Sequence, residues 1–466
     1  METNRATVGP FAARRFGLIV VLIAIAAGGL RVGYVLAVTR HDPLVGDQLY
    51  YSFLADTLAR GDGFRDPEIR DRVVPSADHP PLTSMILTPA SWIIGPDGDA
   101  AKAHRRLTAQ RLTMALVGAL TVAAIAFATR AVVAGPRGPT AGLAAAVVAA
   151  VYPGLWINDG LLMAESVGAL TIALVIWASI RALDEPRQTT MLLLGAAVGL
   201  ACLARAEALL LIPLLVIPVA LTRRGRRDLR PPMAPLRRLI AAGAGCAVVL
   251  APWVIPNLVR FNHPTTLSTN DGLTLIGTNC DEAWNGDSTG LWVLRCIGAV
   301  DSNGDGVDDW SAYQRGLPRI APGQDYSDVS SAYRSAALHY AREHLGRYPR
   351  VAAVRIARTW GLYGVRSAVW YNTGEGRRTK ASWAAAIGFW ILAPVGIMGM
   401  FVLRRRRRPV WPLVSQIVAA TVVSALFYGL WRFRIGAEVA LVIGVGVAIE
   451  SAMGRLRPAP TGRLAP

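Results

Sequence analysis

The feature that most constrains this chain is a series of apolar runs, each near the length that crosses a lipid bilayer. A helix needs about 20 residues to cross the hydrocarbon core, and the 466 residues are 53% hydrophobic but 17% charged. Ten runs can be read along the sequence: 16–38, 112–133, 140–155, 161–180, 191–204, 209–221, 239–254, 384–403, 411–430 and 436–453. The third, fifth and sixth are short. The pattern predicts an all-α polytopic membrane protein with about ten transmembrane helices.

The basic residues indicate how the predicted helices are oriented. A net charge of +18 would suggest nucleic-acid binding in a soluble chain, but here the arginines cluster in segments that fall on one side if ten helices alternate. These are Arg14 and Arg15; Arg130 and Arg137; Arg181 and Arg187; Arg223, Arg224, Arg226, Arg227, Arg230, Arg237 and Arg238; Arg404 to Arg408; and Arg455, Arg457 and Arg463. Because cytoplasmic loops are enriched in Lys and Arg, we expect both termini in the cytoplasm and no nucleic-acid partner.

Most acidic residues lie in the segments on the opposite, extracytoplasmic side, including Glu68 and Asp71. The predicted organisation is residues 1–254 with seven transmembrane helices and a first outer loop at 39–111, an outer region at 255–382, and three helices with a cytoplasmic tail at 383–466. The first apolar run is too long for a cleaved signal peptide and contains Arg31. We therefore expect an uncleaved first helix.

The first outer loop carries two short elements. Leu49, Tyr50, Phe53, Leu54 and Leu58 recur at helical spacing, which predicts a helix that begins at Asp47 and ends before a Gly-Asp-Gly turn. A second apolar stretch, 82–94, follows Asp78-His79-Pro80-Pro81 and is interrupted by a proline. It is too short to span a bilayer, so an interfacial helix is expected.

The large outer segment contains two further features. Cys280 and Cys296 share an oxidising compartment, and a disulfide between them is predicted, whereas Cys202 and Cys246 lie in apolar runs as small fillers. The stretch 301–309 resembles a calcium loop, but position twelve would be Ala312 where such a loop needs a glutamate. A solvated Asp/Gly turn is favoured over a bound ion.

Charged residues also occur at the outer ends of the predicted spans, where they are costly unless paired or functional. They are Glu165, Arg205, Glu207, Arg432, Arg434 and Glu438. Ion pairing explains some of them, such as Arg205 with Glu207 or Glu165 and Arg434 with Glu438. The set as a whole, with Asp47, suits transfer from a lipid phosphate. A carboxylate can take the proton of an incoming hydroxyl, and arginine can hold the departing phosphate through two hydrogen bonds.

The order of several motifs resembles the GT-C glycosyltransferases, in the branch of bacterial protein mannosyltransferases and aminoarabinose transferases. These motifs are Gly46-Asp47-Gln48-Leu49-Tyr50-Tyr51, Asp78-His79-Pro80-Pro81-Leu82, Tyr152-Pro153, Ala164-Glu165-Ser166, Leu203-Ala204-Arg205-Ala206-Glu207, Ala251-Pro252-Trp253 with Pro256-Asn257, and Ser268-Thr269-Asn270-Asp271-Gly272. The chain departs from the family at Gln48, where glutamate is frequent, and at His79, where the aminoarabinose branch has lysine. Gly436 and Ala437 stand where many members have a proline.

The resemblance implies a polyprenyl-phosphate-sugar donor, a glycan, lipid or protein acceptor, and inversion at the sugar carbon. It implies a catalytic Asp47, donor-phosphate binding by His79, Arg205, Arg432 and Arg434, and supporting roles for Asp78, Glu165, Glu207, Tyr50 and Tyr51. No cofactor is required, although a divalent cation stays open. The site is expected on the extracytoplasmic face of the cell membrane.

Two other classes of function were weighed. A transporter or flippase of lipid-linked sugars typically has ionisable groups near the bilayer midplane on broken helices. Here the ionisable groups lie at the outer ends of the predicted spans. A scaffold that binds a partner through its outer loop gives Asp47, Glu165 and Arg205 no purpose. The sequence therefore favours the enzyme.

Overall fold

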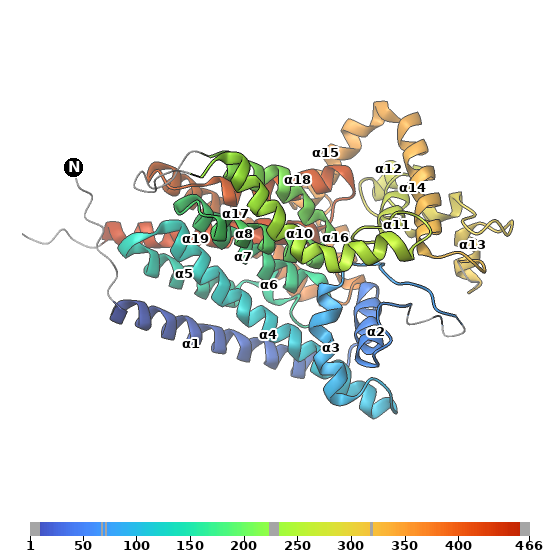
Figure 1. Cartoon of the computed structure of the whole chain (residues 1–466), viewed down its shortest axis with the longest axis horizontal. Helices are drawn as coiled ribbons and strands as arrows, with labels where there is room; N and C mark the ends of the chain where they lie inside the picture. The colour runs from blue at the N-terminus through green and yellow to red at the C-terminus, as the bar shows by residue number, and fades with distance from the viewer. Residues whose placement is uncertain (1–9, 67–68, 70–71, 223–232, 317–319, 457–466) are drawn as a thin grey trace, which may run out of the picture.

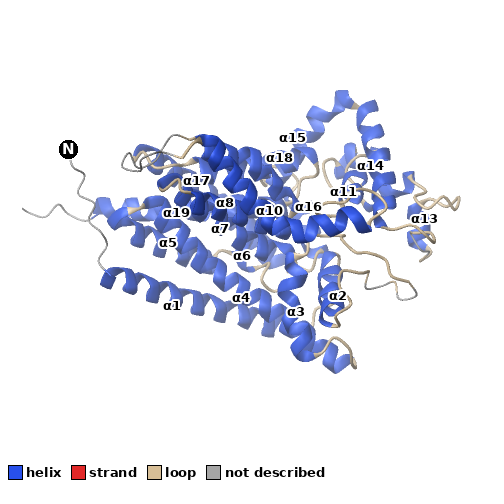
Figure 2. Ribbon diagram, in the orientation of Figure 1, coloured by secondary structure: helices blue, strands red, loops and turns tan. Residues whose placement is uncertain are grey.

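The computed structural model describes residues 10–66, 69, 72–222, 233–316 and 320–456. The arginines at 223–230, Arg457 and Arg463, and the acidic residues Glu68 and Asp71, lie outside this range. The described part is helical, with one isolated bridge between Arg65 and Pro75 in place of a sheet (Figures 1 and 2). The predicted all-α class is confirmed.

Among the described residues, six helical segments are long and apolar enough to cross a membrane, which makes the chain a multi-pass membrane protein. They contain α1 (Pro10–Tyr34), α4 (Ala100–Val133), α7 (Ala164–Asp184), α10 (Pro235–Arg260), α17 (Thr379–Arg405) and α19 (Ile435–Leu456). The remaining predicted spans coincide with shorter apolar helices: α5 (Gly138–Val151) with α6 (Pro153–Trp156), α8 (Gln188–Ala204), a segment Ala206–Leu221 that ends in α9 (Ile217–Leu221), and α18 (Trp411–Leu426). All ten predicted runs are therefore helical.

Small residues let the long helices pack closely. A Cβ atom added to Gly399 of α17 would lie 1.8 Å from the backbone oxygen of Gly444 in α19, and one added to Gly195 of α8 would lie 1.8 Å from that of Ala242 in α10. Neither position can hold a side chain without moving its neighbour helix. Close backbone approach at small residues is typical of helix packing in membranes.

The described arginines that follow α17 lie at one end of the helix bundle. Arg408 donates to the backbone oxygen of Val132 at the end of α4 (2.7 Å) and pairs with Asp184 at the end of α7 (3.3 Å). Arg406 pairs with Glu450 of α19 at 2.5 Å. The helix starts near Glu165 and Arg432 therefore lie at the opposite end of the bundle.

That opposite end carries the elements of the first outer loop. Helix α2 (Asp47–Ala59) begins at Asp47, and α3 (Leu82–Ile94) covers the stretch expected to lie on the membrane surface, so both stretches are helical as predicted. Trp92 and Ile93 of α3 are exposed, as suits a helix on a bilayer surface. Helix α4 begins at Ala100, inside the segment expected to be loop, because Asp99 caps it by accepting from the backbone N–H of Lys102.

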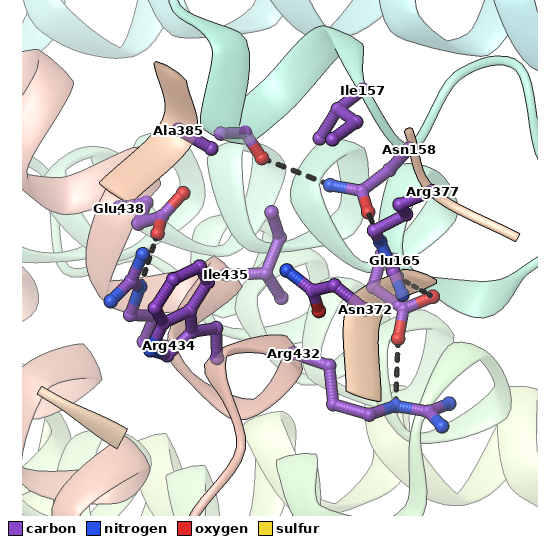
Figure 3. A pocket seen from close by; sticks show the side chains of 12 residues that line it. Ile157, Asn158, Glu165, Asn372, Arg377, Ala385, Arg432, Arg434, Ile435 and Glu438 are labelled. Atoms are coloured by element: carbon purple, nitrogen blue, oxygen red, sulfur yellow. Dashed lines mark hydrogen bonds and ion pairs between the residues drawn. The ribbon is translucent and has the colours of Figure 1, made fainter. Parts of the chain in front are cut away.

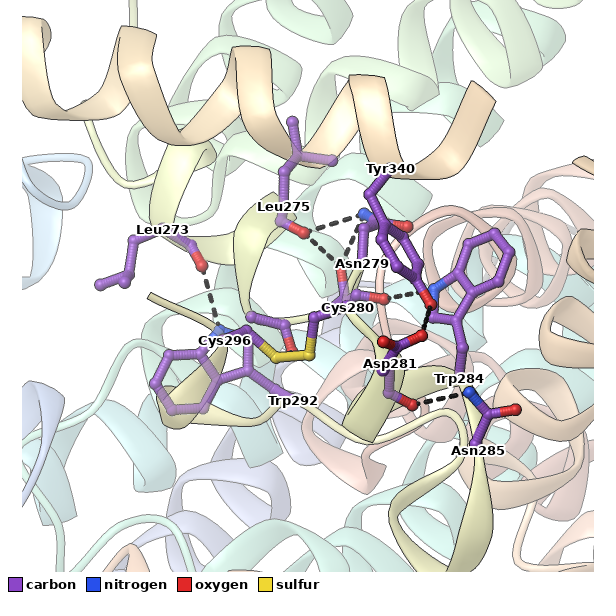
Figure 4. Close-up of a disulfide and its surroundings, with 12 residues drawn as sticks. Leu273, Leu275, Asn279, Cys280, Asp281, Trp284, Asn285, Trp292, Cys296 and Tyr340 are labelled. Atoms are coloured by element: carbon purple, nitrogen blue, oxygen red, sulfur yellow. Dashed lines mark hydrogen bonds between the residues drawn. A yellow bond between two sulfur atoms is a disulfide. The ribbon is translucent and has the colours of Figure 1, made fainter. Parts of the chain in front are cut away.

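The outer region 261–378 forms a small helical layer with a core of its own. It contains α11 (Asp271–Ile276), α12 (Asp281–Trp284), α13 (Asp309–Gln314), α14 (Tyr326–Glu343), α15 (Tyr348–Thr359) and α16 (Val365–Gly374). Trp284, Ile297 and Tyr333 are buried together there. The Cys280–Cys296 disulfide is present at the edge of this core (Figure 4), which confirms that prediction.

Two buried arginines of α15 hold the outer layer together, and one of them, Arg355, also joins it to the membrane helices. Arg355 donates to the backbone oxygens of Thr278 and, at 3.2 Å, of Leu426 at the end of α18. Arg358 donates to the backbone oxygen of Thr289 at 2.7 Å. Because a buried guanidinium needs partners, these contacts fix where the outer layer lies over the bundle.

The stretch 301–309 forms a turn in which its own backbone N–H groups bind the side chain of Asp301. The Asp301 carboxylate accepts hydrogen bonds from the backbone N–H groups of Gly304 (2.8 Å), Asp305 (3.2 Å) and Gly306 (2.8 Å). A short acidic side chain that binds following backbone groups is the geometry of an Asx-type turn.

Candidate active site

Asp47 is the first residue of α2 and lies where three segments meet. Gly46 turns the chain at a φ of 55°, which glycine adopts without strain. The next residue, Gln48, is buried and donates to the backbone oxygen of Glu375 at 3.0 Å, while its own oxygen accepts from the backbone N–H of Leu162 at 3.4 Å. An amide can both donate and accept. Gln48 therefore anchors the start of α2 to two other segments, which a glutamate could not do in the same way.

The Asp47 carboxylate contacts two cationic side chains. Arg432 donates from Nη2 to Oδ2 at 2.8 Å, and Nε2 of His79 lies 3.6 Å from Oδ1. Burial raises the pKa of Asp47, but Arg432 and His79 outweigh it and hold that pKa well below the usual value. In this state Asp47 is an ionised carboxylate of low basicity.

His79 is held in place from several sides. Its ring stacks on Tyr51, with centroids 5.1 Å apart, and meets the edge of Tyr50 at 5.2 Å. Asp78 lies 3.3 Å from Nε2. Burial lowers the pKa of His79, but Asp47 and Asp78 outweigh it, so the net shift is upward. The imidazolium form is favoured, and His79 can act as a cation beside Asp47.

The segment 268–270 fixes the Asp78–His79 turn. The Ser268 hydroxyl donates to the backbone oxygen of Asp78. The Asn270 amide nitrogen lies 3.5 Å from Nε2 of His79, and the Thr269 N–H donates to the backbone oxygen of Ala77 at 2.8 Å. The Ser-Thr-Asn motif thus has a structural role in the site.

Glu165, at the start of α7, is the buried centre of an ion network (Figure 3). Its carboxylate lies 2.8 Å from Nε of Arg432, 3.0 Å from Nη1 of Arg205 and 3.8 Å from Nη2 of Arg377. Arg205 also pairs with Glu207 at 2.5 Å. Arg432 reaches Glu375 at 2.9 Å through Nη1.

The structure brings together most of the predicted site residues and separates one. Asp47, Asp78, His79, Tyr50, Tyr51, Glu165, Arg205, Glu207 and Arg432 form one continuous set of contacts. Arg434 instead pairs with Glu438 at 2.5 Å and lies 3.9 Å from the centre of the Phe389 ring. Figure 3 shows Arg434 turned away from Arg432. The pairing of Arg434 with Glu438 that the sequence left open is confirmed.

Two charged residues of the network were missed from the sequence. Glu375 and Arg377 pair with each other in the turn before α17, and Arg377 also donates to the Asn158 side chain at 2.9 Å. A signal was available, because this turn places Glu375 between two glycines and Arg377 directly after them, shortly before a predicted span. It did not reveal which of its charges face the site.

Four carboxylates of this network face an arginine: Asp47 and Glu375 contact Arg432, Glu165 contacts three arginines, and Glu207 contacts Arg205, whereas Asp78 contacts His79. Within the described residues, no three His, Cys, Asp or Glu side chains are grouped to hold a metal ion. Acidic oxygens already compensated by guanidinium groups are a poor donor set for a divalent cation. The residues present do not fit a metal ion, and the reaction proposed below uses none.

Two small cavities adjoin the network. One, of about 30 Å³, is polar and lies between Glu165, Arg377 and Arg432 (Figure 3). The other, of about 50 Å³, lies among apolar residues of α7, α8, α18 and α19 and ends at Arg205 and Glu207. A cavity with apolar walls that ends at an arginine can receive part of a molecule that has a hydrocarbon portion and an anionic head.

The comparisons with known proteins agree with this architecture. Residues 78–255 match the family described as dolichyl-phosphate-mannose-protein mannosyltransferase. No curated protein matches the chain.

The solved structures of an archaeal oligosaccharyltransferase have a similar fold. The Archaeoglobus fulgidus oligosaccharyltransferase in its apo form is 14% identical with a TM-score of 0.52, over 96% of this chain and 51% of that one. The same enzyme, AglB, with an inhibitory peptide and a dolichol-phosphate is 13% identical with a TM-score of 0.50, over 94% and 50%. ArnT from Cupriavidus metallidurans, bound to undecaprenyl phosphate, gives 14% identity and a TM-score of 0.39 over 94% and 78%.

The chain spans about half the length of the archaeal enzyme that it matches. Its membrane helices and outer layer correspond to that part of the fold. The chain therefore has a fold similar to that of the Archaeoglobus fulgidus oligosaccharyltransferase, and its residues 78–255 are similar to the family described as dolichyl-phosphate-mannose-protein mannosyltransferase.

Proposed function

We propose that the chain transfers a sugar from a polyprenyl-phosphate-sugar to an acceptor hydroxyl, with inversion at the sugar carbon. The observation that carries this proposal is the shared arginine, Arg432, which holds the Asp47 carboxylate at 2.8 Å while it also contacts Glu165. A base and an anion-binding group are thus in direct contact. The matched family is named for a dolichyl-phosphate sugar, and AglB has been solved with a dolichol-phosphate.

The donor would lie with its phosphate at Arg205 and Arg432 and with the adjoining part of its lipid at the apolar cavity between α7, α8, α18 and α19. A phosphate is acceptor-only and binds a guanidinium through two hydrogen bonds. Because both arginines are already paired with carboxylates, the phosphate must share or replace those acids. When it takes Arg432, Asp47 loses its main cationic partner and becomes a stronger base.

The transfer itself then needs one base and cationic stabilisation. The acceptor oxygen attacks the sugar C1 while its proton passes to Asp47. The bond from C1 to the phosphate oxygen breaks, and its electron pair leaves with the polyprenyl phosphate, whose added charge is held by Arg205, Arg432 and the His79 imidazolium. One displacement inverts the configuration at C1.

The described arginines that follow α17 support a location for this reaction. They lie at the end of the bundle opposite Asp47, and cytoplasmic ends are the basic ones. We place both termini in the cytoplasm and the site at the extracytoplasmic face.

The test is donor consumption by the purified protein in lipid nanodiscs, supplied with a series of radiolabelled polyprenyl-phosphate sugars. We expect one class of donor to lose its sugar, and Asp47→Asn to slow that loss by about 10² or more. The matched control is Asp97→Asn, an exposed acid that pairs with Arg60 and should leave turnover unchanged. Full turnover by Asp47→Asn, or retention of every sugar by the wild type, would contradict the proposal.

A further inference from the structure

A third cavity, of about 240 Å³, lies between α2, the residues Asp66, Ser76 and Asp78, the residues Thr269 and Leu273, and α14. It is several times larger than the two cavities beside the arginines. Its walls are tied together by Arg260, which donates to the backbone oxygens of Phe64 (3.0 Å) and Ser76 (2.9 Å). The cavity is therefore a built feature of the outer layer.

Among the described residues, its lining combines aromatic rings with oxygen atoms and includes no basic side chain, although His79 lies 3.3 Å from the Asp78 carboxylate. The rings are those of Tyr50, Phe53, Tyr326 and Tyr333, and the lining also includes the carboxylates of Asp66 and Asp78 but no Lys, Arg or His. Aromatic rings offer flat apolar faces, whereas carboxylate oxygens accept hydrogen bonds from hydroxyl groups. The same carboxylates repel an anion.

A buried hydroxyl in the lining adds a separate observation. Thr269 is 4% exposed, lines this cavity, and its hydroxyl has no hydrogen-bond partner among the described residues. A buried polar group without a partner costs free energy. A ligand hydroxyl in the cavity would supply the missing partner.

The cavity adjoins Asp47. Gly46, the residue before Asp47, lines it, and so does Asp78, which contacts Asp47 through His79 at 3.3 and 3.6 Å. The arginine-lined cavity is bordered by Arg432, which contacts Asp47, and by Glu165, which contacts Arg432. The carboxylate therefore lies between a cationic site and an uncharged or acidic one.

We propose that this cavity is the acceptor site and that it takes an uncharged sugar ring at the end of a glycan. The inference rests on the proposed function. Hydroxyl groups on a ring between tyrosines can reach the Asp66, Asp78 and Thr269 oxygens, and one can approach Asp47. An anionic acceptor, such as a lipid phosphate, is disfavoured by the acidic lining. The volume is below the roughly 300–1,000 Å³ of pockets for drug-sized ligands, which suits a single ring.

Binding without donor tests the inference separately from catalysis. Saturation-transfer NMR on the full-length protein in nanodiscs would use methyl glycosides of neutral hexoses and pentoses, mannose 6-phosphate, and a Ser/Thr-containing peptide. We expect a neutral glycoside to bind and the sugar phosphate to bind at least tenfold more weakly. Leu49→Trp should also weaken glycoside binding at least tenfold, because Leu49 lines the cavity yet is 37% exposed and can be enlarged without disturbing the core.

The matched control is Leu338→Trp, an exposed leucine of α14 outside the cavity lining, which should bind the glycoside as the wild type does. Binding of the peptide with none of the glycosides, equal binding of mannose 6-phosphate, or an unaffected Leu49→Trp would overturn the inference. If labelled donor still loses its sugar in that case, the acceptor assignment fails while the proposed glycosyl transfer stands. If the donor is not consumed but the glycoside still binds, the proposed glycosyl transfer fails while the assignment of the cavity stands.

Discussion

Arg432 donates to the carboxylate of Asp47 at 2.8 Å across 385 residues of sequence. The same guanidinium contacts Glu165 and Glu375, so three acids compete for one cation. Any anion that enters this network competes with Asp47 for Arg432. Donor binding and activation of the base are therefore coupled in the proposed reaction.

Asp47→Asn should separate donor binding from turnover. The amide no longer competes as an anion for Arg432, so we expect the polyprenyl-phosphate-sugar to bind as tightly as to the wild type or severalfold more tightly, while transfer falls by about 10² or more. Direct binding of labelled donor to nanodisc-embedded protein measures the first effect. Clearly weaker binding by the variant would show that Asp47 holds the donor and would remove the proposed competition.

Arg205→Lys should affect the donor more than the acceptor. Lysine keeps the charge but loses the planar fork that now bridges Glu165 and Glu207. We expect the KM for the donor to rise about tenfold while the KM for the acceptor changes little. Arg60→Lys is the control, since Arg60 pairs with Asp62 and Asp97 away from the network. Equal shifts in both KM values would contradict a donor role for Arg205.

His79 should contribute stability that depends on pH. Asp47 and Asp78 raise its pKa against the effect of burial, so its folded pKa lies above the unfolded value of about 6.5. The contribution is then complete below that value and is lost as pH rises through the folded pKa. The Tm difference between wild type and His79→Gln should be largest near about pH 5.5 and smallest near about pH 9.

His339→Gln provides the reference for that pH series, because His339 is an exposed residue that pairs with Glu343 on α14. A thermal scan of both variants and the wild type across the same buffers gives the comparison. If the His79→Gln difference stays constant, or grows toward high pH, the imidazolium is not held by Asp47 and Asp78.

Much of this architecture could be predicted because it depends on local patterns. Apolar length located all ten helical runs, and helical periodicity with Pro80-Pro81 located α2 and α3. A shared oxidising loop was enough to predict the Cys280–Cys296 pair. The contact of Glu165 with Arg205 was one of the ion pairs expected from placing these side chains at one depth, and Asp47 and His79 were expected in the same site.

The remaining features depend on three-dimensional packing that no local pattern carries. Depth alone could not separate Arg432 from Arg434, which are two residues apart but project to different partners on the short turn Trp431–Arg434. Glu375 and Arg377 reach the site because the turn after α16 contacts the start of α2, where Gln48 donates to the backbone oxygen of Glu375. The buried pair of Arg31 with Asp159, at 2.6 Å, joins residues 128 apart and was likewise not foreseen.

Arg434 and Arg432 should therefore respond differently to the same substitution. Arg434→Gln leaves Glu438 as a buried acid without its partner, and breaking such a pair costs about 3–5 kcal/mol. We expect a lower Tm but an unchanged donor affinity in the protein that remains folded. Arg432→Gln should lower donor affinity at least tenfold. If Arg434→Gln weakens donor binding as much as Arg432→Gln, the donor site extends to Arg434.

Removal of the disulfide should loosen the outer layer and leave the membrane helices intact. The bond closes a loop of 16 residues, which on the chain-entropy model stabilises this segment by about 3 kcal/mol. We expect faster hydrogen exchange across residues 271–300 in Cys280→Ser/Cys296→Ser, because Trp284 and Ile297 pack in the core beside the bond. Exchange in α7 and α19 should not change, since those helices depend on apolar length and packing.

Cys202→Ala/Cys246→Ala, which removes the two free cysteines, is the control. Equal protection of residues 271–300 in both double variants would show that the layer is held by its apolar core and by Arg355 and Arg358 without the disulfide.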